Sequence, residues 1–222
     1  MPHEYEKSLC FEEKHQLCKE LMPAPGEDTL LSLLPVFYKE YDLDEDGGLN
    51  DSKVKIEITK HLFFYIPNFS TRKKAVLKHD IHHIITEYPS NIKGETEIGA
   101  WEVASGCKTY WIAWALNLYS LVMGIWFNLP GVYQAFVRGR RSGNLYSNLI
   151  TDKQALEMTV NELRHLFSIP PYHQKLEFTF RDFFYFLFWL LIAGVFALAS
   201  IIVLPLVIVY NIFLFAKRKR KG

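Results

Sequence analysis

The chain has 222 residues, enough for one domain with an appended segment or for two very small domains. Half of the residues are hydrophobic and 15% are aromatic, so there is ample apolar material for a core. The formal net charge of +1 argues against a general nucleic-acid binder.

The cysteines and the N-terminal residues indicate a reducing compartment. Cys10, Cys18 and Cys107 share no metal-ligand spacing, and no secretory leader precedes them. The acidic start, residues 1–6, also lacks the Arg-rich character of a transit peptide. We therefore expect free thiols, and a bacterial origin is favoured over an organellar one.

The sequence predicts an all-α fold, because strand signals are sparse and cap signals recur along the chain. Ser70-Thr71 can cap a helix that stops before Pro89, and Thr151 and Gln154 have the spacing of a capping box. Gly106 closes another helix. The expected helices cover residues 1–22, 29–41, 70–87, 95–105, 107–128, 131–138 and 152–167.

The C-terminal part predicts a membrane anchor. No side chain is charged from Phe183 to Ala216, and a bilayer core needs roughly 20 residues per helical span. One helix of this length would extend about 50 Å, too long for a ~30 Å core without strong tilt. We therefore expect a hydrophobic hairpin that turns near Ala199-Ser200 and tolerates Pro205 inside a helix, with a single span as the alternative.

The basic tail sets the expected topology. Residues 217–221 are all Lys or Arg, and the positive-inside rule places them on the cytoplasmic side of a membrane, here the bacterial cytoplasmic membrane. A hairpin then keeps the domain on the same side. We expect residues 1–175 to form a helical metal-binding domain and residues 176–222 to form the anchor with its basic tail.

A second uncharged stretch covers residues 109–137 and is rich in aromatic and small polar side chains. That polarity favours a buried or interface-dipping helix over a lipid-facing span, although a transmembrane helix remains the alternative. Its aromatic residues either pack in the core or line a pocket for an isoprenoid or acyl chain.

The segment His79-Asp80-Ile81-His82-His83 carries the candidate metal site. His79 and His83 are four residues apart on the expected helix, so both imidazoles reach one cation from one face. Glu95 follows beyond a loop broken by Pro89 and Gly94, in the first turn of a helix that can fold back. Two nitrogens, one or two carboxylates and an open position are typical of catalytic zinc, and manganese or iron would also accept them.

Three neighbours of these residues have open roles. Asp80 can supply an oxygen ligand or a hydrogen bond to a ligand. His82 points about 100° away, toward a supporting or outer-face position. Glu102 lies on the same helical face as Glu95, where it either extends the site or pairs with a nearby cation.

His79-Asp80-x-x-His83 followed by Gly94-Glu95 resembles the metal motif of the coenzyme Q (ubiquinone) biosynthesis protein 4 family. The resemblance covers about residues 30–171 and is loose outside the motif. It implies an all-helical membrane-associated protein with a divalent metal, generally zinc, held by His79, Asp80, His83 and Glu95. It also implies association with other quinone-biosynthesis enzymes. The C-terminal hydrophobic segment and the acidic N-terminus depart from the family pattern.

The activity implied by this resemblance is C1 decarboxylation of a polyprenylated 4-hydroxybenzoate, a lyase reaction of ubiquinone biosynthesis. A Lewis-acid cation suits the charge that develops on the ring, and Glu95 is instead the catalytic proton shuttle if the metal takes only three ligands. The polyprenyl-quinone precursor would keep its tail in the membrane. Arg138, Arg140 and Arg141 are candidates for an anionic head group, or else form a solvated cationic loop.

Other interpretations of these motifs are weaker. A non-catalytic lipid-binding or scaffold protein is the main alternative. A membrane di-iron desaturase or hydroxylase would need further histidine boxes, and a phosphohydrolase of the HD type would have only His165 and Asp152 as extra donors. Residues 42–53 imitate the start of an EF-hand, but Lys53 stands where the bidentate glutamate belongs, so a polar turn is expected.

Overall fold

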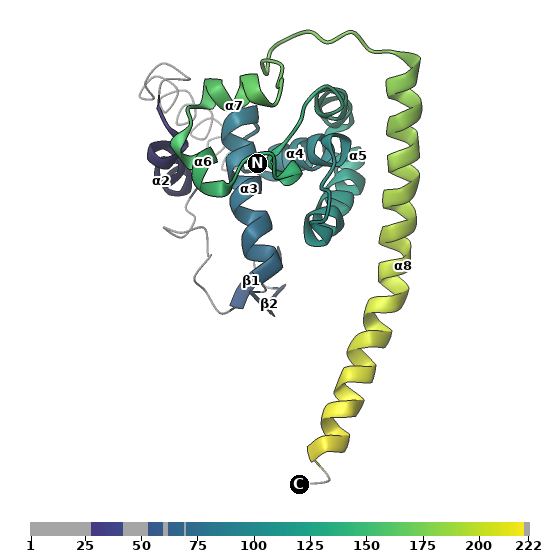
Figure 1. The fold of residues 1–222 in the computed structure, drawn as a ribbon. Coiled ribbons are helices and arrows are strands. Elements are labelled where there is room, and N and C mark those ends of the chain that lie inside the picture. Colours follow the sequence, from purple (N-terminus) through teal and green to yellow (C-terminus); the bar gives the residue numbers. More distant parts are fainter. Residues whose placement is uncertain (1–27, 42–52, 60–61, 69, 220–222) are drawn as a thin grey trace, which may run out of the picture.

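Helices dominate the computed structural model, which describes residues 28–41, 53–59, 62–68 and 70–219 (Figure 1). The all-α prediction is confirmed for the main body of the fold. The expected helix at 1–22, the cysteines Cys10 and Cys18, and the EF-hand-like segment up to residue 52 lie outside the described residues. The elements are α2 (Leu30–Glu40), β1 (Lys53–Thr59), β2 (Leu62–Pro67), α3 (Ser70–Thr86), α4 (Ile92–Ser105), α5 (Trp111–Gly139), the 3-10 turn η1 (Leu145–Ser147), α6 (Asp152–Glu157), α7 (Val160–Leu166) and α8 (Phe180–Lys219).

A small hairpin is the exception to the helical fold. Strands β1 and β2 pair antiparallel, with Val54 opposite Ile66 and Ile56 opposite Phe64. This hairpin is absent from the elements expected from the sequence, although Val54, Ile56 and Ile58 alternate with charged residues at the period of a strand.

The hydrophobic core forms where α3, α4, α5 and α7 meet. Trp101 of α4 and Phe136 of α5 are fully buried in it, together with Ile81 of α3 and Leu163 of α7. Helices α4 and α5 share the most extensive contact between helices. This packing fixes the faces of α3 and α4 that carry the candidate ligands.

Helix α5 contains the break that the sequence predicted between two helices. Asn128 has non-helical backbone angles, φ −160° and ψ 52°, just ahead of Pro130. A proline inside a helix removes one backbone hydrogen bond and crowds the preceding turn, which explains a break at this point. The expected N-terminal half at 107–128 begins later, at Trp111.

The single helix expected at 152–167 is wrong, because the chain forms two short helices there. Thr151 and Gln154 make the predicted capping box of α6, and Thr159 with Glu162 makes a second capping box that starts α7. A capping threonine takes an extended backbone conformation. Thr159 therefore ends one helix region and begins the next.

The predicted C-terminal hairpin is also wrong: α8 is one helix of 40 residues, about 60 Å long at 1.5 Å per residue. Ala199-Ser200 contains no helix breaker. The Ser200 hydroxyl donates a 2.8 Å hydrogen bond to the carbonyl oxygen of Phe196, one turn earlier in the same helix. The helix runs on through Pro205 to Lys219, past Ala216. Its C-terminal half projects beyond the rest of the described chain (Figure 1).

The first half of α8 packs along α5. The rings of Trp114 and Trp189 stack with centroids 5.0 Å apart, and Phe136 meets Phe186 at 5.3 Å. The opposite face of α8 is apolar and exposed, including Phe183, Phe184, Leu187, Phe188, Leu191, Val195 and Leu198. Within the described residues, α5 and α8 are both long and apolar enough to cross a membrane, by length and composition.

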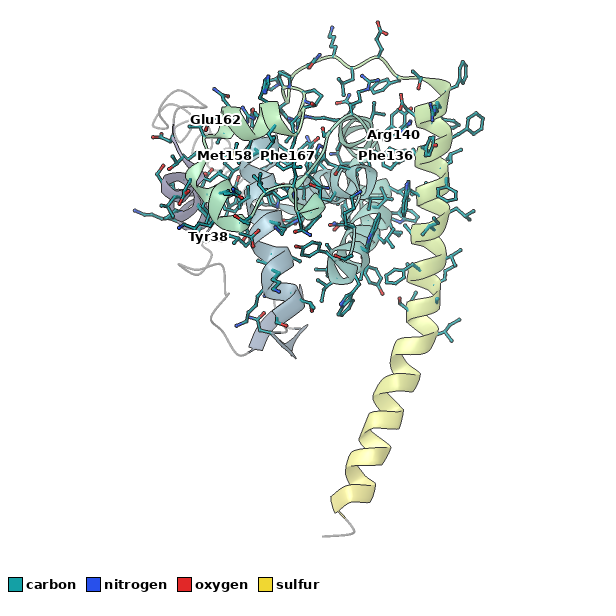
Figure 2. All side chains as sticks on the ribbon, in the orientation of Figure 1. Tyr38, Phe136, Arg140, Met158, Glu162 and Phe167 are labelled. Atoms are coloured by element: carbon teal, nitrogen blue, oxygen red, sulfur yellow. The ribbon has the colours of Figure 1, made fainter. Side chains whose placement is uncertain are left out.

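The loop arginines join α8 to the domain (Figure 2). Arg140 pairs with Asp182, which caps the start of α8 together with Thr179, and the guanidinium of Arg140 lies 4.2 Å from the ring centroid of Tyr185. Arg141 donates to the backbone carbonyl of Glu177. The loop is therefore not merely solvated, because Arg140 and Arg141 bind the start of α8 and the segment before it. Arg140 has an anionic partner, Asp182, and Arg141 has a carbonyl partner, Glu177.

Candidate metal centre

Two histidines of α3 and one glutamate of α4 meet at the candidate centre. His79 and His83 lie one turn apart, and their Nε2 atoms are 3.2 Å apart. Glu95 places Oε1 3.2 Å from Nε2 of His83 and Oε2 3.4 Å from Nε2 of His79. One ligand atom from each residue lies within 4.8 Å of the other two. The sequence prediction that these three side chains converge agrees with this geometry.

A tight turn between the two helices brings Glu95 back to α3. Asn91 caps α4 by accepting a hydrogen bond from the backbone N–H of Gly94 at 3.0 Å. Ser90 donates to Oε1 of Glu95, also at 3.0 Å. A Cβ atom on Gly94 would lie only 1.8 Å from the carbonyl oxygen of Pro89. Glycine is therefore required next to the ligand for this turn to close.

We expect Gly94→Ala to weaken metal binding by about tenfold or more and to destabilise the fold by about 1–3 kcal/mol, since the backbone must move to relieve the clash. Competition with a zinc-chelating dye measures the affinity, and thermal unfolding measures the stability. Gly194→Ala on α8 is the matched control, because no atom of the described residues lies within 4 Å of the position that its Cβ would take. Equal zinc affinity in Gly94→Ala and wild type would contradict the role of this turn.

The second nitrogen of each imidazole fixes its tautomer. Nδ1 of His83 lies 2.8 Å from the carbonyl oxygen of Tyr88, which can only accept, so Nδ1 carries the proton. Nδ1 of His79 lies 2.9 Å from Oε1 of Glu102. Both Nε2 atoms then present lone pairs to each other. Two lone pairs at this distance repel unless a proton or a cation lies between them.

The distances suit a divalent cation. Zinc bonds to His nitrogen and carboxylate oxygen of about 2.0–2.2 Å in a tetrahedron place ligand atoms roughly 3.3–3.5 Å apart. The two Nε2 atoms are 3.2 Å apart, and each lies close to a different oxygen of Glu95, His83 to Oε1 at 3.2 Å and His79 to Oε2 at 3.4 Å. With one oxygen of Glu95, the three ligand atoms lie within 4.8 Å of one another. The side chain of Glu95 is 41% exposed, so the open side of the cluster faces solvent. The residues present therefore fit a three-ligand site with room for a further ligand.

Glu102 of α4 holds the histidine rings of α3 by hydrogen bonds to their Nδ1 atoms. Its carboxylate is fully buried and accepts through Oε1 from Nδ1 of His79 and, at 2.7 Å, from Nδ1 of His82. Oε2 accepts from Asn117 and, at 3.0 Å, from the hydroxyl of Tyr146. Carboxylates that hold the outer nitrogen of a metal-binding histidine orient the ring and raise its basicity. Glu102 therefore pairs with the rings of His79 and His82 and orients them, and it lies outside the cluster of His79, His83 and Glu95.

His82 has the supporting position predicted for it, and it is fully buried rather than on an outer face. Its Nε2 accepts a hydrogen bond of 3.0 Å from the backbone N–H of Leu145, which leaves Nδ1 as the donor to Glu102. Its ring also meets Trp101 and Tyr146 edge-on. Sequence reasoning did not find Tyr146, Asn117 or the carbonyl of Tyr88, which come from other elements.

The charges of the cluster are mutually stabilising. Burial alone would raise the pKa of the Glu95 and Glu102 carboxyls, but the hydrogen bonds and charges of the histidines outweigh it and lower both pKa values well below the ordinary range. Burial disfavours the charged form of His79, yet Glu102 and Glu95 raise its pKa well above the usual value. The carboxylates of Glu95 and Glu102, one on each side of His79, therefore favour a positive charge between them.

Asp80 is the one predicted ligand that does not join the cluster. Its carboxylate is buried against α2, where the hydroxyl of Tyr38 donates to Oδ2 at 3.0 Å. A residue one position from His79 is rotated by about 100° around the helix, which explains why its side chain faces α2. The cluster brings together His79, His83 and Glu95 without it.

The competing interpretations gain no support from the described residues. His165 is exposed on α7, and Asp152 pairs with Lys78, so neither supplements the cluster as an HD-type site would need. Arg138 is buried rather than presented to a lipid: it donates at 2.7 Å to the carbonyls of Pro170 and Thr86. Cys107 is a free, buried thiol.

Comparison with protein-family models, curated proteins and solved structures found no match for this chain. The assignment of the site therefore rests on its own geometry.

Proposed function

We propose that this protein is a membrane-anchored metalloenzyme that holds one divalent cation, most favourably zinc, on His79, His83 and Glu95. The single observation that carries the proposal is the pair of Nε2 atoms 3.2 Å apart, each on a ring whose Nδ1 is already engaged. Glu95 adds the third ligand, with Oε1 3.2 Å from Nε2 of His83 and Oε2 3.4 Å from Nε2 of His79. Three protein ligands and an open position are typical of catalytic rather than structural zinc.

The reaction proposed for the centre is C1 decarboxylation of a polyprenylated 4-hydroxybenzoate. The support is the motif of His79, Asp80, His83 and Glu95, which resembles that of the coenzyme Q biosynthesis protein 4 family. In this reaction the bond between the ring and its carboxylate breaks, carbon dioxide leaves, and the ring carbon takes up a proton. A bound divalent cation supplies a Lewis acid for the substrate's anionic oxygen.

Glu95, Glu102 and Asp80 have different roles in the proposed reaction. Glu95 is the most exposed member of the cluster, so when one of its oxygens holds the cation, the other is placed to pass a proton between solvent and substrate. Glu102 holds His79 in the tautomer that keeps Nε2 free. Asp80 does not ligate the cation in this arrangement; it accepts a hydrogen bond from Tyr38 and so joins α3 to α2.

Membrane attachment is the second part of the proposal and rests on α8. Its exposed apolar face and its length suit a lipid environment, where the tail of an isoprenoid substrate would reside. The cytoplasmic side expected for the domain depends on a hairpin, and a continuous α8 removes that argument. The domain packs beside the N-terminal half of α8, whereas the basic residues lie at its C-terminal end (Figure 1). Association with other enzymes of quinone biosynthesis is proposed on the same resemblance.

Glu95→Gln tests the proposed function. We expect the variant to keep its fold and to lose at least 100-fold of its decarboxylation rate, because an amide cannot shuttle a proton and binds a cation weakly. The measurement is release of carbon dioxide from a prenylated 4-hydroxybenzoate by detergent-extracted protein. Glu157→Gln, an exposed glutamate on α6, is the control.

Two results would contradict enzymatic function. The first is a decarboxylation rate of Glu95→Gln equal to that of wild type. The second is no release of carbon dioxide by wild type loaded with one metal per chain. The second result with intact metal and lipid binding would favour a scaffold protein. Two irons per chain would favour a desaturase or hydroxylase instead.

A further inference from the structure

Helix α5 presents an exposed apolar face along its first half. Within the described residues, most of the exposed large hydrophobic side chains lie on α5 or α8, and the few others are scattered over the domain. Those on the first half of α5 recur every three or four residues, which is the spacing of one helical face. They are Leu116, Tyr119, Met123, Trp126 and Phe127. No charged side chain interrupts residues 109–137.

This face of α5 continues into the exposed face of α8. Tyr119 is itself 39% exposed, and its ring centroid lies 5.3 Å from that of Phe196 on α8. The stacked rings of Trp114 and Trp189 join the same two helices closer to the start of each. The two helices therefore form one continuous apolar surface. A surface of this kind marks contact with a membrane or with another protein.

The position of this contact along α8 favours lipid as the partner. Helix α8 starts beside the charged residues Arg181 and Asp182, and its uncharged stretch covers residues 183–216. A bilayer core takes up roughly 20 residues of helix, so a core placed within this stretch begins no later than about residue 197. Phe196, which contacts Tyr119, then lies at the surface of the core or inside it. The first half of α5 lies there with it.

Two exposed tryptophans stand at the ends of this face. Trp111 begins α5 and is 59% exposed, and Trp126 precedes the break and is 83% exposed. Tryptophan is enriched at membrane–water interfaces, where its ring is in apolar surroundings and its N–H reaches polar groups. The two residues are about 22 Å apart along a helix, less than the ~30 Å of a bilayer core. This length suits a helix that lies in one leaflet rather than one that crosses both.

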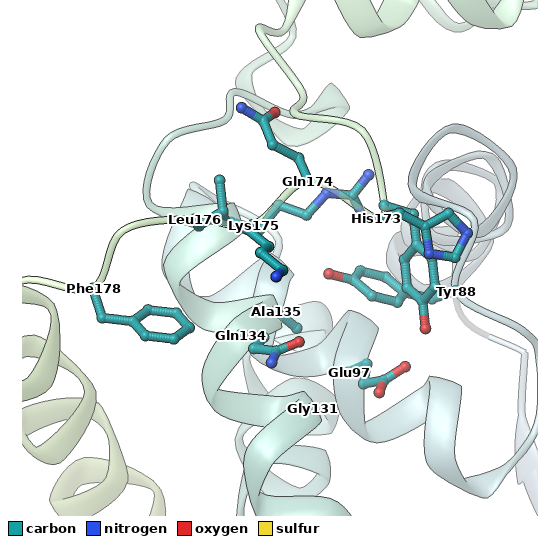
Figure 3. A pocket seen from close by; sticks show the side chains of 12 residues that line it. Tyr88, Glu97, Gly131, Gln134, Ala135, His173, Gln174, Lys175, Leu176 and Phe178 are labelled. Atoms are coloured by element: carbon teal, nitrogen blue, oxygen red, sulfur yellow. The ribbon is translucent and has the colours of Figure 1, made fainter.

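The apolar face ends at the break in α5. Between Gly131 and Gly139 the one exposed side chain is that of Gln134. Gln134 lines a cavity of about 510 Å³ together with Lys175 of the segment before α8 (Figure 3). The second half of α5 lies near the charged start of α8, where the ring centroids of Tyr133 and Phe178 are 5.2 Å apart. Polar groups therefore replace the apolar face on the side toward the charged start of α8.

We propose that the first half of α5 is a second membrane contact, with Leu116, Met123 and Trp126 in the leaflet that α8 enters beside the domain. The inference rests on the proposed membrane attachment of α8, and it depends neither on the metal nor on the reaction. Two contacts hold the domain against the bilayer, whereas one helix would let it swing. Helix α4, which carries Glu95, packs more extensively on α5 than on any other described helix. The metal centre is thereby held at a fixed distance from the lipid.

Spin labels on the full chain in vesicles of phosphatidylcholine and phosphatidylglycerol test this contact. A nitroxide is attached to Leu116→Cys or Met123→Cys, with Cys10 and Cys18 replaced by serine and the buried Cys107 left in place. Molecular oxygen is apolar and concentrates in hydrocarbon, whereas a polar nickel chelate stays in water. We expect both labels to collide with oxygen at least about threefold more often than with the chelate.

Matched controls separate the contact of α5 from the anchor. Leu31→Cys is exposed on α2, across α3 from α5 and α8 (Figure 1), and Gln134→Cys is exposed on α5 beyond the break. Both labels should favour the chelate, whereas Ile201→Cys on α8 should favour oxygen. Labels at Leu116 and Met123 that match the two controls, beside an Ile201 label in lipid, would overturn the α5 contact and leave the anchor standing. An Ile201 label that favours the chelate would overturn both.

A second copy of the chain is the other partner that could cover this face. Labels on two copies in contact broaden each other's spectra. Broadening of the Met123→Cys spectrum that disappears on dilution with unlabelled protein would show that a second copy, and not lipid, lies on the first half of α5. The proposal predicts an unchanged line shape on dilution.

Discussion

Replacement of His83 by alanine is expected to reduce bound metal from about one equivalent per chain to below about 0.1. The variant removes one of three ligand atoms and leaves Nε2 of His79 facing solvent rather than a second nitrogen. Loss of one ligand from a three-ligand site typically weakens binding by several orders of magnitude, because the remaining pair cannot surround the cation. Elemental analysis of dialysed protein measures the stoichiometry.

A control variant at His165 shows whether loss of metal is specific to the histidines of the cluster. His165→Ala removes an exposed histidine from α7 that has no part in the cluster, and it should retain full metal content. His79→Ala should behave as His83→Ala does, since the two rings have equivalent roles. Retention of stoichiometric, tightly bound metal by both His79→Ala and His83→Ala would rule out the cluster as the metal site.

Glu102→Gln is expected to have the second largest effect, on both metal affinity and stability. Glu102 accepts from four donors, two of them imidazoles, and a glutamine can offer only one oxygen to them. Two buried donors then face an amide N–H₂ group, at a cost of about 2–4 kcal/mol. Metal affinity should fall by about 10–100-fold, as is usual when a carboxylate behind a ligating histidine is removed.

Metal titration and thermal unfolding with and without zinc check this prediction. The metal-free variant should unfold about 5–15 °C below wild type, given roughly 2–4 °C per kcal/mol for a domain of this size. Glu157→Gln, exposed on α6, should change neither quantity. Wild-type zinc affinity in Glu102→Gln would show that the tautomer of His79 does not depend on this carboxylate.

Much of the fold could be predicted from local signals. The ends of α2 and α3 and the start of α6 follow from caps and breakers within a few residues of sequence, and so does the break ahead of Pro130. The errors have the same local origin. The expected helix at 152–167 overlooks the second capping box, which Thr159 begins. The expected hairpin follows from bilayer thickness alone, although no helix breaker stands at Ala199-Ser200.

The candidate site was predicted as far as helical spacing allows. His79 and His83 converge because they are one turn apart, and Glu95 joins them because Gly94 permits a close turn. Helical spacing turns Asp80 away from the face of His79 and His83, but its contact with Tyr38 depends on the position of α2, which no local pattern of α3 encodes. The same is true of Tyr146 and Asn117, whose contacts with Glu102 are made across the tertiary fold.

X-ray absorption spectroscopy at the zinc edge, on full-length protein loaded with one equivalent of metal, tests the central claim most directly. We expect a first shell of nitrogen and oxygen at about 2.0–2.1 Å, with the outer-shell scattering of two imidazole rings. The imidazole contribution should fall to one ring in His83→Ala protein that is forced to bind by excess zinc. A shell that contains sulfur, or one without imidazole scattering, would contradict a centre built from His79, His83 and Glu95.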